Sequence, residues 1–227
     1  ADNISQGLII NSKLLILDGK RAIIYDLLET ENRVHYLDTI GYIPTTQIAR
    51  SPSGLESQLY ESVNLLQSSR YNLFASTETD KIYQLDETNI NEVELVEILN
   101  ENAEWVVKTK NDDYTVDLEK GQVKFLIAIG KSPVDGRDNV RIKFKKNSDE
   151  NKSQINKCTM MYAYGYAGNN NRAFLTGNED YPNIVSFSYI DDITYMPVEN
   201  VIKAGLETIP ITGMVRLNDG KLAVLKD

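Results

Sequence analysis

The chain has 227 residues, which is long enough for one large domain or two modest ones. Its 24 lysines and arginines stand against 33 aspartates and glutamates, so the net charge is −9. This balance favours solubility and makes direct nucleic-acid binding a disfavoured function, because a phosphate-binding surface needs clustered cations.

One cysteine, Cys158, excludes an internal disulfide and a multi-cysteine zinc site, and we predict that it is a small buried residue. No apolar stretch approaches the ~20 residues of a membrane span, and no basic-then-apolar signal pattern opens the chain. We therefore expect a soluble protein that has no membrane partner and was not built for an oxidising compartment.

The first predicted elements are strands over residues 7–10, 13–17 and 21–25. Asp18-Gly19 separates the last two, and an Asp-Gly pair between apolar runs is a strong hairpin signal. The runs are continuously apolar rather than alternating, which indicates strands covered on both faces, as in stacked sheets. A further short strand is predicted around His35, at residues 35–37.

Residues 41–54 have the Pro, Ser and Thr content of a crossing linker. Four apolar residues follow at spacings that would place them on one face of a helix: Leu55, Leu59, Val63 and Leu66.

Residues 79–146 show the clearest alternation of apolar and polar residues, in three runs: Tyr114/Val116/Leu118, Val123/Phe125/Ile127 and Val140/Ile142/Phe144. Alternation predicts strands with one buried and one wet face. Ile82–Leu85, Val93–Leu99 and Trp105–Lys108 complete a predicted β-sandwich with Trp105 in its core. A basic cluster ends this region: Arg141, Lys143, Lys145 and Lys146. Its alternation favours the wet face of a strand over contact with DNA.

After a polar segment at 147–157, short apolar runs recur between turn residues, at 158–164, 184–189, 201–203, 209–215 and 221–225. Spacings of roughly 8–12 residues are typical of an antiparallel meander in a sandwich, barrel or propeller blade. Asn218-Asp219-Gly220 supplies a hairpin turn.

The predicted fold is therefore all-β, an antiparallel, propeller-blade-like meander formed by the two chain ends around an inserted β-sandwich. The predicted boundaries are 1–46 for the first part of the meander, 47–78 for a linker with or without a short helix, 79–150 for the sandwich and 151–227 for the second part of the meander. The meander holds roughly one and a half to two four-stranded blades, whereas a propeller needs at least about four. We expect the others in a longer polypeptide or in another chain.

Several segments resemble motifs of tailed-phage and prophage virion proteins. They are Phe174-Leu-Thr-Gly-Asn178 followed by Tyr181-Pro-Asn183, then Asp192-Ile-Thr-Tyr-Met-Pro197, and also Gly41-Tyr-Ile-Pro-Thr-Thr46 and Tyr60-Glu-Ser-Val-Asn-Leu-Leu66. Met196 stands where the family pattern has an aromatic residue. The resemblance covers most of the chain and implies a structural tail or neck protein, similar to propeller-bearing tail-nozzle proteins. In that family the piece around Leu55–Leu66 leads into a β-domain along an extended path, so we keep this alternative and place it slightly ahead of the helix.

No catalytic, cofactor-binding or metal-binding residue is predicted. His35 is the only histidine and has no nucleophile motif near it, and no Gly-rich phosphate loop is present. The carboxylate pairs Asp112-Asp113, Glu179-Asp180 and Asp191-Asp192 are interpreted as turn formers rather than catalytic acids. Asp135–Asn139 and Asn178–Asp180 could offer oxygen ligands to Ca²⁺, but they lack EF-hand spacing, and turns are the better interpretation.

The chain contains 13 tyrosines, and several cluster at Tyr162, Tyr164, Tyr166, Tyr181, Tyr189 and Tyr195. They indicate packing between blades, with a sugar-binding or subunit-contact surface around Gly165–Asn171 as the alternative.

The predicted function is thus a non-enzymatic virion structural protein of a phage tail or neck, made in the bacterial host cytoplasm. Its expected partners are other virion subunits, including further copies of itself. The alternatives are a host-surface glycan-binding adhesin and, less favoured, a glycan depolymerase.

Overall fold

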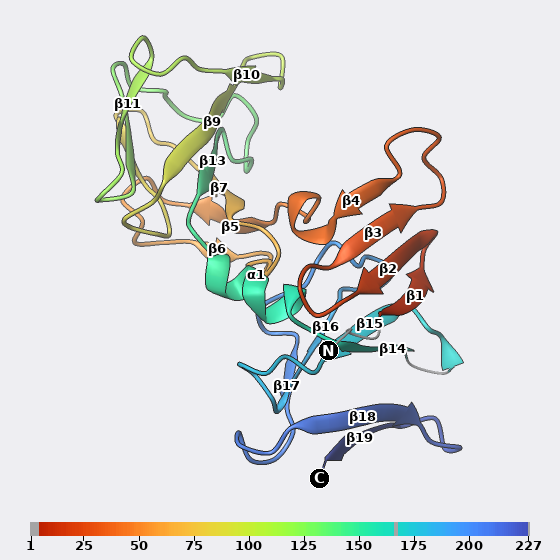
Figure 1. Cartoon of the computed structure of the whole chain (residues 1–227). Coiled ribbons are helices and arrows are strands. Elements are labelled where there is room, and N and C mark those ends of the chain that lie inside the picture. The colour runs from red at the N-terminus through yellow and green to blue at the C-terminus, as the bar shows by residue number, and fades with distance from the viewer. Residues whose placement is uncertain (1–4, 166–167, 227) are drawn as a thin grey trace. The chain divides into compact units, whose positions relative to one another are not determined.

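The structure is a computed structural model that describes residues 5–165 and 168–226, and strands dominate it, which confirms the predicted all-β class (Figure 1). The described residues fall into two units. The first contains the residues up to Tyr42, Asn64–Gln67 and the residues from Ser148 onward, and the second contains Ile43–Val63 and Ser68–Asn147. None of the helices in the described ranges is long and apolar enough to cross a membrane.

The first sheet of the first unit, here called the N-terminal sheet, is an antiparallel meander of four strands in chain order. Its strands are β1 (Gln6–Ile10), β2 (Lys13–Leu17), β3 (Ile23–Asp26) and β4 (Val34–Tyr36), and the 3₁₀ turn η1 (Leu37–Thr39) follows. The predicted Asp-Gly turn joins β2 to β3, with Gly19 at a φ of 76°. The carboxylate of Asp18 accepts the backbone N–H groups of Lys20 and Arg21 at 2.9 and 3.0 Å, which fixes this turn.

A second four-stranded meander, the C-terminal sheet, contains β14 (Met160–Tyr164), β15 (Arg172–Thr176), β16 (Ile184–Phe187) and β17 (Val201–Lys203). A separate hairpin follows, made of β18 (Ile211–Arg216) and β19 (Leu222–Lys226). Its turn is the predicted one, because Gly220 has a φ of 82° and the Leu217 N–H donates to the Lys221 carbonyl at 2.8 Å. The apolar runs of this region are strands, as predicted.

Two separate cores hold these three layers together. Leu15 and Ile24 of the N-terminal sheet pack with Ala173 and Leu175 of the C-terminal sheet, and all four are fully buried. On the other face of β15, Phe174 packs with Met214 and the other inward side chains of the hairpin. The order of layers is therefore N-terminal sheet, C-terminal sheet, hairpin (Figure 1).

The polar segment 147–157 is not merely a boundary, since it forms the helix α1 (Asp149–Asn156). Ile155 anchors it in the first core, and the amide of Asn178 donates to the carbonyls of Ser153 and Gln154 at 3.0 and 3.1 Å, in its last turn. A helix with one apolar contact residue has no 3.6-residue apolar period, so periodicity could not reveal it.

The second unit consists of one six-stranded sheet and one three-stranded sheet. In sheet order the larger contains β10 (Trp105–Val107), β9 (Glu92–Leu99), β13 (Val140–Lys145), β7 (Ser69–Phe74), β5 (Thr45–Arg50) and β6 (Gln58–Leu59). The smaller contains β11 (Tyr114–Asp117), β12 (Gln122–Phe125) and β8 (Ile82–Gln84). Both sheets contribute to one core, with Phe74 and Ile142 from the larger and Tyr83 and Phe125 from the smaller.

The predicted linker over 47–78 is wrong in part, because much of it belongs to the second unit as strands. β7 pairs with β13 in antiparallel fashion, and β5 pairs with β7 in parallel. The helix alternative is wrong. Leu55 is 88% exposed, and the N–H groups of Tyr60 and Glu61 donate to carbonyls of β5 at 3.1 and 3.0 Å. Pairing with β5, which spacing along the sequence cannot show, determines the path of this segment.

The prediction for Trp105 is also wrong, since this side chain lies outside the core. Trp105 on β10 pairs with Leu99 on β9. Ile98, the residue next to Leu99 on β9, packs against the core. Successive strand residues face opposite sides, so Trp105 lies on the outer face of the larger sheet. There the Arg141 guanidinium covers its ring at 4.6 Å.

Candidate functional site

The most unusual surface of the first unit is the side of the N-terminal sheet that faces away from its core. The strand register places two rows of side chains there: Ile9, Leu14, Tyr25 and Val34 in one, and Gly7, Ile16, Ile23 and Tyr36 in the other. Every residue of both rows is apolar or aromatic. A solvated sheet face normally carries polar residues at these positions.

This outward face is open in the structure. Ile9 is 57% exposed on β1, and Val34 and Tyr36 are 64% and 47% exposed on β4. The sequence predicted strands covered on both faces, and the first core covers only one of them. The outward face is therefore a candidate for contact with another layer of protein.

Two arginines border the face and already have partners. The Arg21 guanidinium lies 3.7 Å from the centre of the Tyr36 ring and pairs with Asp38 at 2.7 Å. Arg33 donates from Nη1 to the Tyr25 hydroxyl at 3.0 Å. Sequence reasoning missed both arginines because only the cross-strand register brings them to these rings.

The hairpin β18–β19 has a second apolar outward face. Met214, Leu222 and Val224 point into the second core, so the alternate residues of both strands face outward. These are Gly213, Val215, Ala223 and Leu225. Val215 and Leu225 are 41% and 48% exposed.

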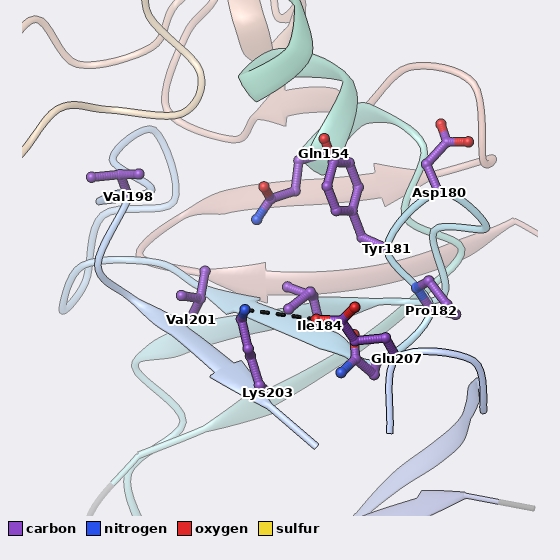
Figure 2. Close-up of a pocket in the computed structure, with 10 residues that line it drawn as sticks. Gln154, Asp180, Tyr181, Pro182, Ile184, Val198, Val201, Lys203 and Glu207 are labelled. Atoms are coloured by element: carbon purple, nitrogen blue, oxygen red, sulfur yellow. Dashed lines mark ion pairs between the residues drawn. The ribbon is translucent and has the colours of Figure 1, made fainter. Parts of the chain in front are cut away.

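A pocket of about 460 Å³ lies in the first unit between the residues that lead into β16 and the edge strand β17. Figure 2 shows Lys203 reaching from β17 toward Glu207, with Gln154 and Tyr181 farther up in the view. Lys203 and Glu207 are 4.0 Å apart, and both side chains are largely exposed. Such an exposed, loose ion pair gives little binding energy by itself, and the geometry names no ligand for this pocket.

A smaller pocket of about 310 Å³ lies beside Gly165–Asn171, where a sugar-binding or subunit-contact surface was the alternative to packing between blades. Tyr164, Arg172 and Phe174 line it together with Asn171. From β18, Arg216 holds the loop, with Nη2 3.3 Å from the Gly165 carbonyl and 3.2 Å from that of Asn169.

The tyrosines do not form one surface. Tyr162 and Tyr164 contact the hairpin. The Tyr162 hydroxyl accepts the backbone N–H of Arg216 at 3.2 Å. The Tyr164 hydroxyl donates to the Gly220 carbonyl at 2.9 Å. Tyr189 packs with Tyr195 elsewhere in the unit, with ring centres 5.4 Å apart. Tyr181 lines the larger pocket, and Tyr166 lies outside the described residues. These contacts agree with packing between layers.

The carboxylate pairs take part in turns. Asp113 accepts the Thr109 N–H at 2.7 Å, and Asp192 accepts the Thr194 N–H at 2.8 Å. Asp180 pairs with Lys157 at 2.6 Å. In the described residues no group of three or more His, Cys, Asp or Glu side chains could hold a metal ion.

The two segments weighed as Ca²⁺ ligands are also structural. Asp138 accepts the Ala49 N–H at 2.9 Å, and Asn139 bonds with both the Ser76 N–H and the Gly130 carbonyl. The side-chain amide nitrogen of Asn178 donates to the Ser153 carbonyl in α1. Its side-chain oxygen accepts the Asp180 N–H at 2.9 Å.

His35 lies on β4 with Nε2 3.0 Å from a Glu29 carboxylate oxygen. Cys158 is buried in the first core, as predicted, and burial raises the pKa of its thiol to about 12.

The basic cluster lies along and just beyond β13, and most of it is engaged within the second unit. Arg141 pairs with Glu97 at 2.7 Å and Lys143 with Glu94 at 3.3 Å. Lys146 donates to the carbonyls of Thr88 and Asn89 at 2.7 and 3.0 Å. The alternation of this strand is as predicted, with Val140, Ile142 and Phe144 fully buried.

Comparison with known proteins finds no matching family model, no matching curated protein and no matching solved structure.

Proposed function

We propose that this chain is a non-enzymatic structural protein of a tailed-phage virion, part of the tail or neck, and that it acts by holding neighbouring subunits through the faces of its sheets. The observation that carries the proposal is the outward face of the N-terminal sheet, four strands wide, whose residues are all apolar or aromatic. A protein that works by assembly needs broad apolar contact rather than a few reactive groups.

The family-like segments support the proposal because their residues build the fold. Asn178 bonds with the last turn of α1, and Asn183 donates to the Gly205 carbonyl at 3.2 Å. Ile193 and Met196 lie in the first core. The two four-stranded antiparallel meanders support the propeller-blade part of the proposal, because a propeller blade is a four-stranded sheet that packs face to face on its neighbours. The two sheets around one core in the second unit support the proposed inserted β-sandwich.

Immunogold electron microscopy of purified particles, with antibodies against this chain, tests the assignment. Labelling of the neck or tail tube is the expected result and supports a connecting role. Intact and disrupted particles that both remain unlabelled would contradict it.

A second candidate function is glycan binding by a tail-tip adhesin, which the pocket lined by Tyr164, Arg172 and Phe174 favours. Aromatic rings beside amide and guanidinium donors suit a sugar ring. Labelling at the distal tip together with glycan-array binding that Tyr164→Ala abolishes would select this candidate. Tyr60→Ala is the control, because this tyrosine is exposed like a surface binding residue but does not line the pocket.

A further inference from the structure

We infer that the pocket beside Gly165–Asn171 binds an acidic sugar, a pyranose ring that carries a carboxylate, and that Arg172 is the residue that selects the carboxylate. The inference rests on the second candidate function, glycan binding at this pocket, and names the class of sugar.

The walls of the pocket come from two neighbouring strands whose side chains point the same way. Tyr164 on β14 pairs with Arg172 on β15, and directly opposed residues of an antiparallel pair lie on one face of the sheet. The Tyr164 and Phe174 rings meet edge to face, with their centres 5.5 Å apart. These two rings give the pocket an aromatic wall beside the Arg172 guanidinium. Its volume of about 310 Å³ lies near the lower end of the range for ligand sites, which suits a ligand the size of a sugar.

The charge of the pocket favours an anionic ligand. Of the described residues that line it, Arg172 alone carries a charge. Within the described ranges this guanidinium forms no ion pair and no side-chain hydrogen bond, and it lies 5.5 Å from the centre of the Phe187 ring. Arg21 and Arg141, in contrast, each pair with a carboxylate at 2.7 Å. Arg172 therefore keeps its donors for a ligand, in a chain whose net charge is −9.

The residue types around Arg172 favour a sugar carboxylate over a bare ion. A guanidinium presents two parallel N–H donors that match the two oxygens of a carboxylate. The side chains of Asn169 and Asn171 also line the pocket and offer amide donors and acceptors for hydroxyl groups. Phosphate would match the guanidinium as well, but it would leave the aromatic wall and the amides without a partner.

Contacts from the hairpin and from Gly165 position the amide side of the pocket. Arg216 donates from Nη1 to the Gly168 carbonyl at 3.3 Å, in addition to its bonds with the carbonyls of Gly165 and Asn169. A Cβ at Gly165 would clash with the side-chain oxygen of Asn171. The amides are thus held in place before a ligand arrives, which lowers the entropic cost of binding.

NMR titration of the isotope-labelled whole chain tests the inference with two probes that share one ring. Glucuronate carries the carboxylate, and glucuronamide replaces it by a neutral amide. Glucuronate should bind at least about tenfold more tightly, because charge-assisted hydrogen bonds to Arg172 form only with the carboxylate. The side-chain N–H signals of Arg172 and Asn171 should shift along the titration.

Three variants separate the carboxylate from the ring. Arg172→Gln should lower the affinity for glucuronate to that for glucuronamide and leave the affinity for glucuronamide unchanged. Tyr164→Ala should weaken both probes by the same factor, because they present the same ring to the aromatic wall. Arg137→Gln is the matched control for the loss of a charge. Arg137 is exposed, lies in the second unit and pairs with no carboxylate of the described residues, so this variant should leave both affinities unchanged.

Equal affinities of the wild-type chain for the two probes would overturn the inference and leave glycan binding itself standing. This comparison needs no variant, so it decides the matter even if circular dichroism shows that Arg172→Gln does not fold. Acetate or inorganic phosphate that binds as tightly as glucuronate would also overturn the inference, because the pocket would then recognise an anion without a sugar.

If neither sugar shifts any signal from the pocket, the inference and the glycan-binding candidate are both wrong. The structural role in the virion is decided separately, by the labelling of particles. A chain that binds glucuronate but is missing from virions would defeat only that role.

Discussion

The side-chain carbonyl oxygen of Asn64 accepts the backbone N–H of Met196 at 2.9 Å, which joins two segments 132 residues apart in sequence. The same oxygen accepts the Leu66 N–H at 3.1 Å, and the amide nitrogen donates to the carbonyls of Tyr42 and Thr194, each at 2.8 Å. Asn64 is fully buried and satisfies four backbone groups. It therefore fixes the short segment Asn64–Gln67 within the first unit.

Replacing Asn64 by Ala should lower the free energy of unfolding by about 3–5 kcal/mol, because it leaves several buried backbone groups without partners. Urea denaturation followed by circular dichroism measures the change. Asn102→Ala, in an exposed turn, serves as the control and should change stability by less than about 0.5 kcal/mol. Equal losses in the two variants would contradict the role assigned to Asn64.

Trp105→Ala should cost much less than truncation of a core ring. The variant loses the contact between the Trp105 ring and Arg141 together with some partly buried area. This loss should lower the free energy of unfolding by about 1–2 kcal/mol. Phe125→Ala empties a fully buried position and should cost about 3–5 kcal/mol. The free energies of unfolding of the two variants, measured side by side, decide the matter, and a larger loss for Trp105→Ala would place this ring in the core after all.

The Asp38 carboxylate should make stability depend on pH in the acid range. Burial alone raises the pKa of Asp38, but hydrogen bonds from Arg21 and Asn156 outweigh it and hold the pKa below its ordinary value. The folded state therefore binds this proton less readily than the unfolded state. The stability that Asp38 contributes is present above its unfolded pKa of about 4 and is lost as pH falls through the lower folded value.

Asp38→Asn tests this pH dependence. The difference in free energy of unfolding between wild type and variant should be largest near neutral pH and shrink as pH is lowered from about 6 to about 3. A difference that stays constant over this range would show that Asp38 does not titrate as described. Asp112→Asn, at an exposed turn, provides the comparison.

The Cys158 thiol should react with a disulfide reagent only when the protein opens. Its burial in the first core blocks access, and a pKa raised to about 12 leaves almost no thiolate at pH 8. Labelling should be slow in buffer and complete within the mixing time in denaturant, with Cys158→Val as the blank. Rapid stoichiometric labelling of the native protein would contradict burial of this side chain.

The strands and tight turns could be predicted from the sequence because their signals are local. Asp18-Gly19 and Asn218-Asp219-Gly220 form the expected turns, and the alternation of Val140, Ile142 and Phe144 gives the expected buried face of β13. These patterns depend on the period of a strand and on the positive φ that Gly accepts.

The errors concern the pairing and register of strands, which the apolar pattern of a single strand does not show. β5 and β7 look like a linker until β13 pairs with β7, and Trp105 lies outside the core because of its register against Leu99. The candidate surface was predicted in part. The continuous apolar runs of β1 to β3 indicated strands covered on both faces. The outward face of the hairpin could not be predicted, because it depends on which side of β18 packs against Phe174.

Quantitative mass spectrometry of gradient-purified phage particles, released from bacteria that carry the gene for this chain, tests the central claim most directly. If the chain is a structural tail or neck subunit, its peptides should co-purify with the particles at several copies per virion, in constant proportion to the capsid protein. Particles that retain full infectivity and contain no peptides of this chain would contradict the claim.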